Sequence, residues 1–418
     1  MPESAALIRL AFPLLVGLSV PMIFFGRSVM AVVLLAAFAK FLASDLRATA
    51  WVQFRRKLIM VLGLSISGTV GLWTISAVGS LDPFRSLEAV WRTGIFVGMG
   101  ALFYEALKLD NEFRWVAVRS LVIATAATTF LGLLAEIGWP QLYWGLRFKG
   151  WLSTELVNEL KAFSSLVVVL LPILLWSIFA ERNRSLYQFL AIFGAIGTCA
   201  LVLESHNRAA IAGMLGMSIA LMVCWASRPR TRKYVLLIGA LTAFVFIVVI
   251  AWLKISRGNW GSSTPDYDWF FPVWLVDFQR QIIWSYSLDI ARSAPWFGIG
   301  ANTINFVSGA NAPMPGNESL NILPSHPHNW IVEVIAETGG VGFIALLSIY
   351  VGLIYQLWRG FWRSGRAIYV VACAILVGYL VSGLFNFSYW SAWWQISTII
   401  GLAIALSLPD LSEPSDSI

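Results

Sequence analysis

Twelve long apolar runs are the feature that most constrains how this chain can fold. A helix needs about 20 apolar residues to cross about 30 Å of hydrocarbon, and each run is close to that length. Because 58% of the residues are hydrophobic and only 12% are charged, a water-soluble fold would expose too much apolar surface. We therefore expect an all-α polytopic membrane protein with about twelve transmembrane helices, approximately at 6–25, 28–44, 58–79, 86–107, 115–137, 159–180, 186–203, 209–226, 234–254, 330–357, 367–386 and 391–409.

Basic residues gather in alternate loops between these runs, where they set the orientation of the chain. By the positive-inside rule this face is cytoplasmic, and both termini then lie in the cytoplasm. Because the cations are divided among short loops, they form no continuous basic face, and no nucleic-acid partner is expected. The residues are Arg47, Arg55, Arg56, Lys57, Lys108, Arg114, Arg182, Arg184, Arg228, Arg230, Arg232, Lys233, Arg359, Arg363 and Arg366.

Two segments on the opposite face are too long to be simple turns, about 138–158 and about 255–329. Long loops in compact proteins are usually functional or disordered, and the aromatic and apolar stretches of the second segment argue against disorder. Within it, residues 277–293 have helical spacing, which Pro295 ends. We expect short helices packed on the membrane surface there.

The chain is expected to form one transmembrane domain, 1–409, that includes this long loop, followed by a cytoplasmic tail, 410–418. The first apolar run lacks a cleavage site and is predicted to be a retained span. Three cysteines lie within apolar runs and are expected to be buried hydrophobes rather than a disulfide or metal set. They are Cys199, Cys224 and Cys373.

Two of the three histidines, His326 and His328, lie where the long loop meets the tenth run. An imidazole near neutral pH can accept or orient a hydroxyl proton, although a histidine near a membrane surface is more often an interfacial residue. Glu333 and Glu337 follow on one helix face. Carboxylates at that depth should face the protein interior or a wet cavity, and pairing with buried arginines is an equally good alternative.

Arginines on the same face form a second group of candidates. Arg208 follows His206 at the start of a predicted helix, where an anion is favoured, and Arg280 lies in the helical part of the long loop. The forked guanidinium group suits phosphate. The structural alternative is that each side chain only reaches toward lipid headgroups. Arg147 and Lys149 are weaker candidates.

These motifs resemble the O-antigen ligase and polymerase superfamily, and specifically the O-antigen ligases. In that family a His-Asn pair is followed by nine residues and Gly-x-x-Gly, an arginine lies in a short external turn, and another arginine precedes Trp, Pro and Gly-x-Gly. The turn arginine has different neighbours here, since the family often has Ser-Arg-Gly. The corresponding residues are His328-Asn329, Gly339-Gly340-Val341-Gly342, His206-Asn207-Arg208-Ala209, Arg280, Trp284, Pro295 and Gly298-Ile299-Gly300.

The resemblance implies a C-type membrane glycosyltransferase (GT-C) fold in the bacterial inner membrane, with the active site facing the periplasm. It implies undecaprenyl-pyrophosphate-linked O-antigen as donor and lipid A–core oligosaccharide as acceptor, with inversion at the anomeric carbon. His328 would activate or align the acceptor hydroxyl, and Arg208 and Arg280 would hold the pyrophosphate. Possible supporting residues are His326, Asn329, His206, Arg147 and Lys149.

Neither a metal nor another cofactor is expected. The first external loop, Gly26-Arg27, has no acidic residue, and Asp266 with Asp268 is a weak cation signal. The chain also has no P-loop for ATP-driven transport.

Three other functions remain open. A polysaccharide polymerase and a protein O-oligosaccharyltransferase would share this chemistry, although the compact chain mildly disfavours the latter. A lipid-linked glycan flippase would need charged residues along a path between the two faces, whereas the motifs here gather on one face.

Overall fold

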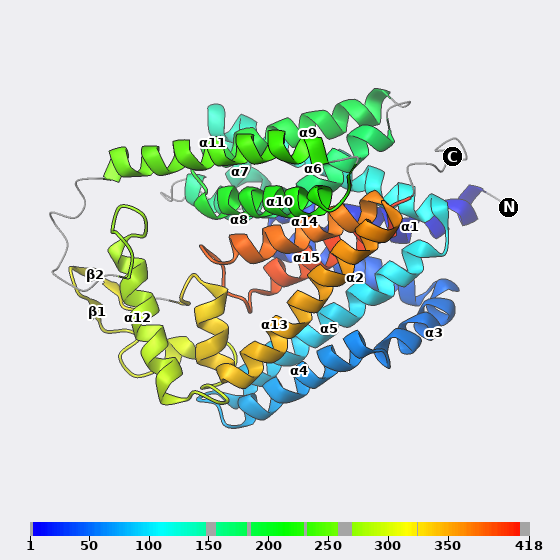
Figure 1. Ribbon diagram of the computed structural model, residues 1–418. Coiled ribbons are helices and arrows are strands. Elements are labelled where there is room, and N and C mark those ends of the chain that lie inside the picture. The colour runs from blue at the N-terminus through cyan, green and yellow to red at the C-terminus, as the bar shows by residue number, and fades with distance from the viewer. Residues whose placement is uncertain are drawn as a thin grey trace.

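The computed structural model describes residues 3–147, 156–181, 185–229, 232–257, 270–323 and 325–409. Each of the twelve predicted apolar runs contains a long helix, which confirms the all-α membrane architecture (Figure 1). These helices are α1 (Glu3–Ser19), α2 (Arg27–Leu42), α4 (Val61–Val78), α5 (Pro83–Lys108), α6 (Asn111–Ile137), α8 (Leu156–Ala180), α9 (Ser185–Glu204), α10 (Arg208–Ala226), α11 (Arg232–Arg257), α13 (Trp330–Ser364), α14 (Ala367–Ser382) and α15 (Ala392–Ser407).

Length and composition alone qualify fewer helices as membrane spans. Among the described residues six helices are long and apolar enough, or seven if α2 and α3 (Leu46–Leu58), bent by 98°, form one broken span. The basic stretch around Arg55, Arg56 and Lys57, which we expected to be a loop, lies mostly in the helix α3. The stretch lacks Gly and Pro and contains good helix formers. The apolar helices α14 and α15 have 16 residues each, about 24 Å of helix, and most of their residues are buried by other helices.

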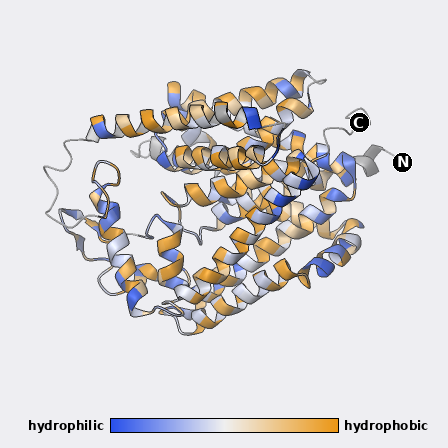
Figure 2. Ribbon diagram, in the orientation of Figure 1, coloured by the Kyte–Doolittle hydropathy of each residue, from blue (hydrophilic) through white to orange (hydrophobic). Residues whose placement is uncertain are grey.

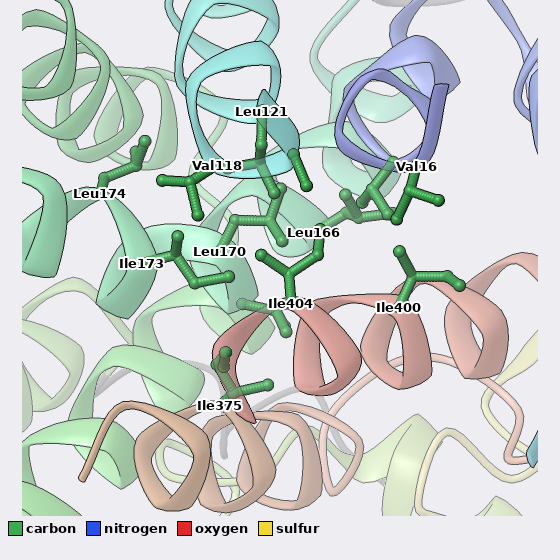
Figure 3. Packing of buried hydrophobic residues seen from close by; sticks show 14 of the residues in the cluster. Val16, Val118, Leu121, Leu166, Leu170, Ile173, Leu174, Ile375, Ile400 and Ile404 are labelled. Atoms are coloured by element: carbon green, nitrogen blue, oxygen red, sulfur yellow. The ribbon is translucent and has the colours of Figure 1, made fainter. Parts of the chain in front are cut away.

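The main core lies where α1, α6, α8, α14 and α15 meet. Branched aliphatic side chains from these helices interdigitate there (Figure 3). They include Val16 of α1, Leu121 of α6, Leu170 of α8, Ile375 of α14 and Ile404 of α15, and each of them is fully buried.

Small residues bring α10 and α14 into close contact. A Cβ added at Gly216 would lie 2.8 Å from the side chain of Val381, and one at Gly378 would lie 2.5 Å from the side chain of Met217. Glycines at such positions let helix backbones approach closely in a membrane protein. The consequence is that the start of α10 and the loop after α14 lie at the same end of the bundle.

Basic residues lie together at the opposite end of the bundle. The guanidinium of Arg228 lies 5.4 Å from the ring of Phe361, and Lys57 pairs with Glu105. Figure 2 shows hydrophilic residues gathered around α3 at this end and around α12 at the other, with mainly hydrophobic helices between them. Hydrophilic residues thus lie at both ends of the bundle among the described residues, and the basic residues of α3 lie at one of them.

Residues 270–323 form a layer at the end away from α3, and we call it the outer layer (Figure 1). Its main element is α12 (Phe278–Ser293), which confirms the predicted helix at 277–293. A 3₁₀ turn, η3 (Ile304–Phe306), and a two-stranded antiparallel hairpin that the sequence did not predict complete it, together with its own small apolar core. The hairpin pairs β1 (Pro313–Met314) with β2 (Asn317–Asn321).

Helix α13 is interrupted at Gly339, whose φ of 67° and ψ of 179° are not helical. The backbone groups released by the break bond to the outer layer, since Gly340 donates to the Pro295 carbonyl at 2.8 Å and Val341 to that of Trp296 at 3.2 Å. A non-helical backbone inside a membrane protein is tolerated only when other protein groups satisfy it in this way. Gly339 and Gly340 therefore join α13 to the outer layer.

A short helix, α7 (Pro140–Leu146), and a 3₁₀ helix, η1 (Pro21–Phe25), complete the described elements. Cys224 and Cys373 are buried, as expected, whereas Cys199 is only half-buried. Several predictions lie outside the described residues: those for Lys149, Asp266, Asp268 and the tail 410–418.

Candidate active site

The segment from Ser325 to Asn329 connects the outer layer to α13. Asn329 ends it as the N-cap of the helix, with its side-chain oxygen accepting from the backbone N–H of Ile331 at 3.0 Å. His328, immediately before the cap, has a φ of 55°. This left-handed conformation is uncommon for a residue other than glycine, and it costs on the order of 1–3 kcal/mol. A histidine held there points to a functional requirement at this position.

Both histidine rings bond to the same backbone carbonyl, that of Asn386 in the loop between α14 and α15. His326 Nε2 and His328 Nδ1 each lie 3.0 Å from this oxygen, and the ring centroids are 4.2 Å apart. A carbonyl oxygen can only accept, so each of these nitrogens carries the proton and donates it. In neutral His328 the unprotonated atom is therefore Nε2, which is free to accept a proton from a substrate hydroxyl.

The surroundings keep both rings neutral. Burial, followed by the neighbouring His328, lowers the pKa of His326 to about 3. Burial also lowers the pKa of His328, and the positive charge of Arg280 lowers it further. In His326 the second nitrogen, Nδ1, accepts from the Ser325 hydroxyl at 2.8 Å. Both nitrogens of His326 are engaged, so His328 is the candidate base.

Arg208 and Arg280 come together at the first turns of two helices. Arg208 begins α10, directly after the N-cap Asn207, and Arg280 lies in the first turn of α12, after the N-cap Asp277. The carboxylate of Asp277 lies between them, since its Oδ2 is 3.7 Å from Arg208 Nη1 and 3.6 Å from Arg280 Nε. Burial lowers the pKa of Arg280, and the charge of Asp277 opposes this effect. A guanidinium stays protonated nevertheless, so the site holds two positive charges.

Trp284 joins α12 to the histidine segment. Its indole Nε1 donates to the Pro327 carbonyl at 2.9 Å, and it lies four residues after Arg280 on the same helix face. The spacing between arginine and tryptophan in the sequence motif thus has a physical basis. Trp284 fixes the histidine loop, and Arg280 lies one helical turn away from that contact.

Asn207 fixes the position of Arg208, the first residue of α10. Its side-chain nitrogen donates to the Lys161 carbonyl and to the hydroxyls of Ser164 and Ser165 on α8, all within 2.9 Å. Its oxygen caps α10 by accepting from the Ala210 N–H at 3.2 Å. A buried polar side chain satisfied in this way fixes the start of α10, and with it the backbone of Arg208.

The remaining candidates have other partners in the structure. Arg147 donates to the Tyr143 hydroxyl at 2.6 Å at the end of α7. His206 is exposed, also has a positive φ of 45°, and interacts electrostatically with Glu136 of α6. Asn329 acts as a helix cap. In the described part of the chain, no hydrogen bond joins any of these three residues to the His328 ring.

Glu333 and Glu337 are buried, as predicted, but neither pairs with an arginine among the described residues. Glu337 accepts from the backbone N–H groups of residues 302, 303 and 304 at 2.8–2.9 Å, and from the indole of Trp390. Glu333 accepts from the Ser388 hydroxyl at 2.5 Å and the Tyr389 N–H at 2.7 Å. The alternative of buried Arg–Glu pairs is wrong here, because loop N–H groups supply the donors. The two acids hold the loops that carry the outer layer and Asn386.

Sequence reasoning missed two contributors to the site. Asp277 could have been recognised as a helix N-cap, since it precedes a helical pattern. The Asn386 carbonyl gives no sequence signal, because every residue has one. Within the described residues no three His, Cys, Asp or Glu side chains form a group that could hold a metal ion.

Comparison with known proteins covers most of this cluster, although not the loop that contains Asn386. Residues 190–347 match the family model described as O-antigen ligase. The resemblance to the O-antigen ligase family is confirmed. The matched region contains Arg208, Arg280 and His328, together with the glycines at the break in α13.

Curated relatives of this chain carry a consistent name. A protein of Rickettsia conorii named "Putative polysaccharide ligase" is 26% identical over 137 residues, which is 32% of each chain. Counterparts in Rickettsia felis and Rickettsia bellii are 26% and 24% identical, over 32% and 29% of this chain and 33% and 29% of their own. The alignments span about a third of the length of these relatives.

Proposed function

We propose that this protein is an O-antigen ligase, a glycosyltransferase that moves a glycan from undecaprenyl pyrophosphate to lipid A–core oligosaccharide. The observation that carries the proposal is the convergence of Arg208 and Arg280 beside Asp277, with the Nε2 of neutral His328 as proton acceptor. The family match and the names of the relatives support the reaction class.

The two arginines suit the donor pyrophosphate. Their guanidinium groups belong to the first turns of α10 and α12, where the positive end of the helix dipole also favours an anion. Negative charge grows on the pyrophosphate as the glycosidic bond breaks, so cations fixed there stabilise the transition state more than the ground state. No metal is required in this scheme, since the arginines supply the positive charge.

His328 suits the acceptor. The acceptor hydroxyl oxygen forms a bond to the anomeric carbon from the side opposite the leaving group, and its proton passes to His328 Nε2. The bond between the anomeric carbon and the pyrophosphate oxygen breaks, and its electron pair leaves with polyprenyl pyrophosphate. Displacement from the opposite side inverts the anomeric configuration. The Asn386 carbonyl stabilises the imidazolium formed, because it accepts from Nδ1–H.

The distribution of charge supports an orientation in the bacterial inner membrane. Basic residues lie at the end of the bundle around α3, so this end is proposed to face the cytoplasm and the outer layer the periplasm. Both termini would then be cytoplasmic.

The test is transfer by purified protein in excess chelator, with a polyprenyl-pyrophosphate O-antigen donor and lipid A–core as acceptor. We expect product from the wild type, and a loss of rate of about 10²–10⁴-fold for His328→Ala, as for removal of a general base. The control is Asn321→Ala on the exposed hairpin, which should keep full activity.

Other outcomes would replace the proposal. Lengthening of the donor glycan without lipid A–core product would make the protein a polymerase, and glycosylated Ser or Thr in a pilin-like protein would make it a protein O-oligosaccharyltransferase. A donor left intact with every acceptor would favour transport. Full activity of His328→Ala would refute the role of this side chain.

A further inference from the structure

The carboxylate of Asp277 lies where a phosphate of the donor would be expected. Its Oδ2 approaches both guanidinium groups, at 3.7 Å from Arg208 Nη1 and 3.6 Å from Arg280 Nε. These distances are longer than those of charge-assisted hydrogen bonds, about 2.7–2.9 Å, so the ion pairs are loose. A phosphate that fits the two guanidinium groups better can therefore displace the Asp277 carboxylate without first breaking strong bonds.

The other oxygen of Asp277 has a separate structural task. Its Oδ1 accepts from the Arg280 backbone N–H at 3.0 Å and caps α12. The cap fixes the carboxylate in the site whether or not a ligand is present. Asp277 therefore holds two like-charged side chains in one place while the site is empty, which would otherwise cost free energy through their mutual repulsion.

The same charge acts differently on donor and product. In the donor, both phosphates of the pyrophosphate are esterified, one to the lipid and one to the glycan. Transfer releases polyprenyl pyrophosphate, whose terminal phosphate has gained an ionisable oxygen with a second pKa near 6. A fixed carboxylate beside this phosphate repels the more highly charged product more strongly than the donor.

We propose that Asp277 is a positioning residue that preorganises Arg208 and Arg280 in the empty site and weakens the binding of the pyrophosphate product, so that it leaves after transfer. The inference rests on the proposed function. It adds that release of the product depends on a carboxylate inside the cation site.

The variant that tests this is Asp277→Asn, because asparagine caps helices as well as aspartate does and differs only in charge. Inorganic pyrophosphate is the probe, and its binding to the purified full-length protein is measured by calorimetry without turnover. We expect Asp277→Asn to bind pyrophosphate about tenfold more tightly, equivalent to about 1.4 kcal/mol. At saturating donor, kcat should fall while the KM for donor also falls, because product leaves more slowly.

A matched control lies at the same end of the bundle. Asp82 caps α5 by accepting from the Arg85 N–H at 3.1 Å, three residues before an arginine, as Asp277 does before Arg280. Asp82→Asn should leave pyrophosphate binding unchanged. Asp277→Ser, which also retains a capping group without the charge, repeats the test if the asparagine variant is poorly folded.

The possible failures are distinguishable. Arg208→Gln should weaken pyrophosphate binding. If it does, and Asp277→Asn binds pyrophosphate no more tightly than the wild type, the role of Asp277 is refuted while the anion site stands. If Arg208→Gln and Arg280→Gln both leave pyrophosphate binding unchanged, the anion site itself is refuted, and the proposed function with it.

Discussion

At the residue scale, the histidine pair shows how a backbone atom can set the chemistry of a side chain. The Asn386 carbonyl accepts from both rings, and this fixes the proton of His328 on Nδ1. Neutrality is fixed by burial, which lowers the pKa of both histidines. His328 is therefore ready to accept a proton at neutral pH, and it should remain so somewhat below the pKa of an ordinary histidine, about 6.5.

The low pKa of His326 makes the fold sensitive to acid. In the unfolded chain this ring takes up a proton near pH 6.5, whereas the folded protein resists protonation down to about pH 3. The unfolded state binds more protons between these values, so stability is fully present above pH 6.5 and declines as the pH falls through this window. We expect the melting temperature of the purified protein to fall accordingly, and His326→Gln to reduce the dependence on pH.

His206→Gln is the control for this measurement, because His206 is exposed and has no part in the carbonyl pair. The melting temperature of His206→Gln should fall with acid as much as that of the wild type. An equal decline in His326→Gln would show that other groups cause the acid sensitivity.

At the element scale, the break in α13 joins the membrane bundle to the outer layer. Gly298 and Gly339 both have positive φ, and their backbones meet those of Glu337 and Trp296. A Cβ added at Gly298 would lie 2.3 Å from the Glu337 carbonyl carbon, and one at Gly339 would lie 2.3 Å from that of Trp296. Only residues without a Cβ allow this approach, which accounts for the first glycine of the Gly-x-Gly motif and the first glycine of the Gly-x-x-Gly motif.

Gly298→Ala should destabilise the protein by about 2–4 kcal/mol, since it combines strain at positive φ with a backbone clash. Thermal unfolding in detergent measures the effect. Gly352→Ala, within helix α13, is the control, because a Cβ there meets no atom within 4 Å and should be neutral or slightly stabilising. Equal melting temperatures for the two variants would contradict this role of the glycine contact.

At the scale of the whole molecule, the apolar runs predicted the helices well, because each run long enough to span a membrane must satisfy its backbone internally. The errors in these helix predictions lie at the ends of the runs. The predicted run 367–386 ends as a helix at Ser382, since the next residues form the loop that contains Asn386. The hairpin at 313–321 was missed because β1 has only two residues and β2 is short, polar and without alternation.

The site was predictable in part for a similar reason. Arg208, Arg280 and His328 are visible as polar residues at the ends of apolar runs, but their proximity depends on the packing of α10 against α14 and of α12 against α13. The contact through Asp277 is also a matter of three dimensions, because Arg208 lies in a distant part of the sequence.

The proposed orientation can be tested by cysteine labelling. In a background without the three native cysteines, Ser319→Cys lies on the outer layer and Ser364→Cys at the basic end, and both positions are exposed. In intact cells with a permeable outer membrane, an impermeant maleimide should label position 319 and not position 364. Lysed membranes should label both. Labelling of position 364 alone in intact cells would show that the orientation is the opposite of the one proposed.

The contact at Asn386 also determines what a mutational survey of this protein can detect. The atom that holds both histidines belongs to the main chain, so Asn386→Ala keeps it and is expected to retain activity. A survey by side-chain replacement would score this position as dispensable. The carbonyl in the loop would nevertheless still determine which nitrogen of His328 is basic. A change in the length of the loop, by one inserted or deleted residue, would reveal the dependence that no substitution can.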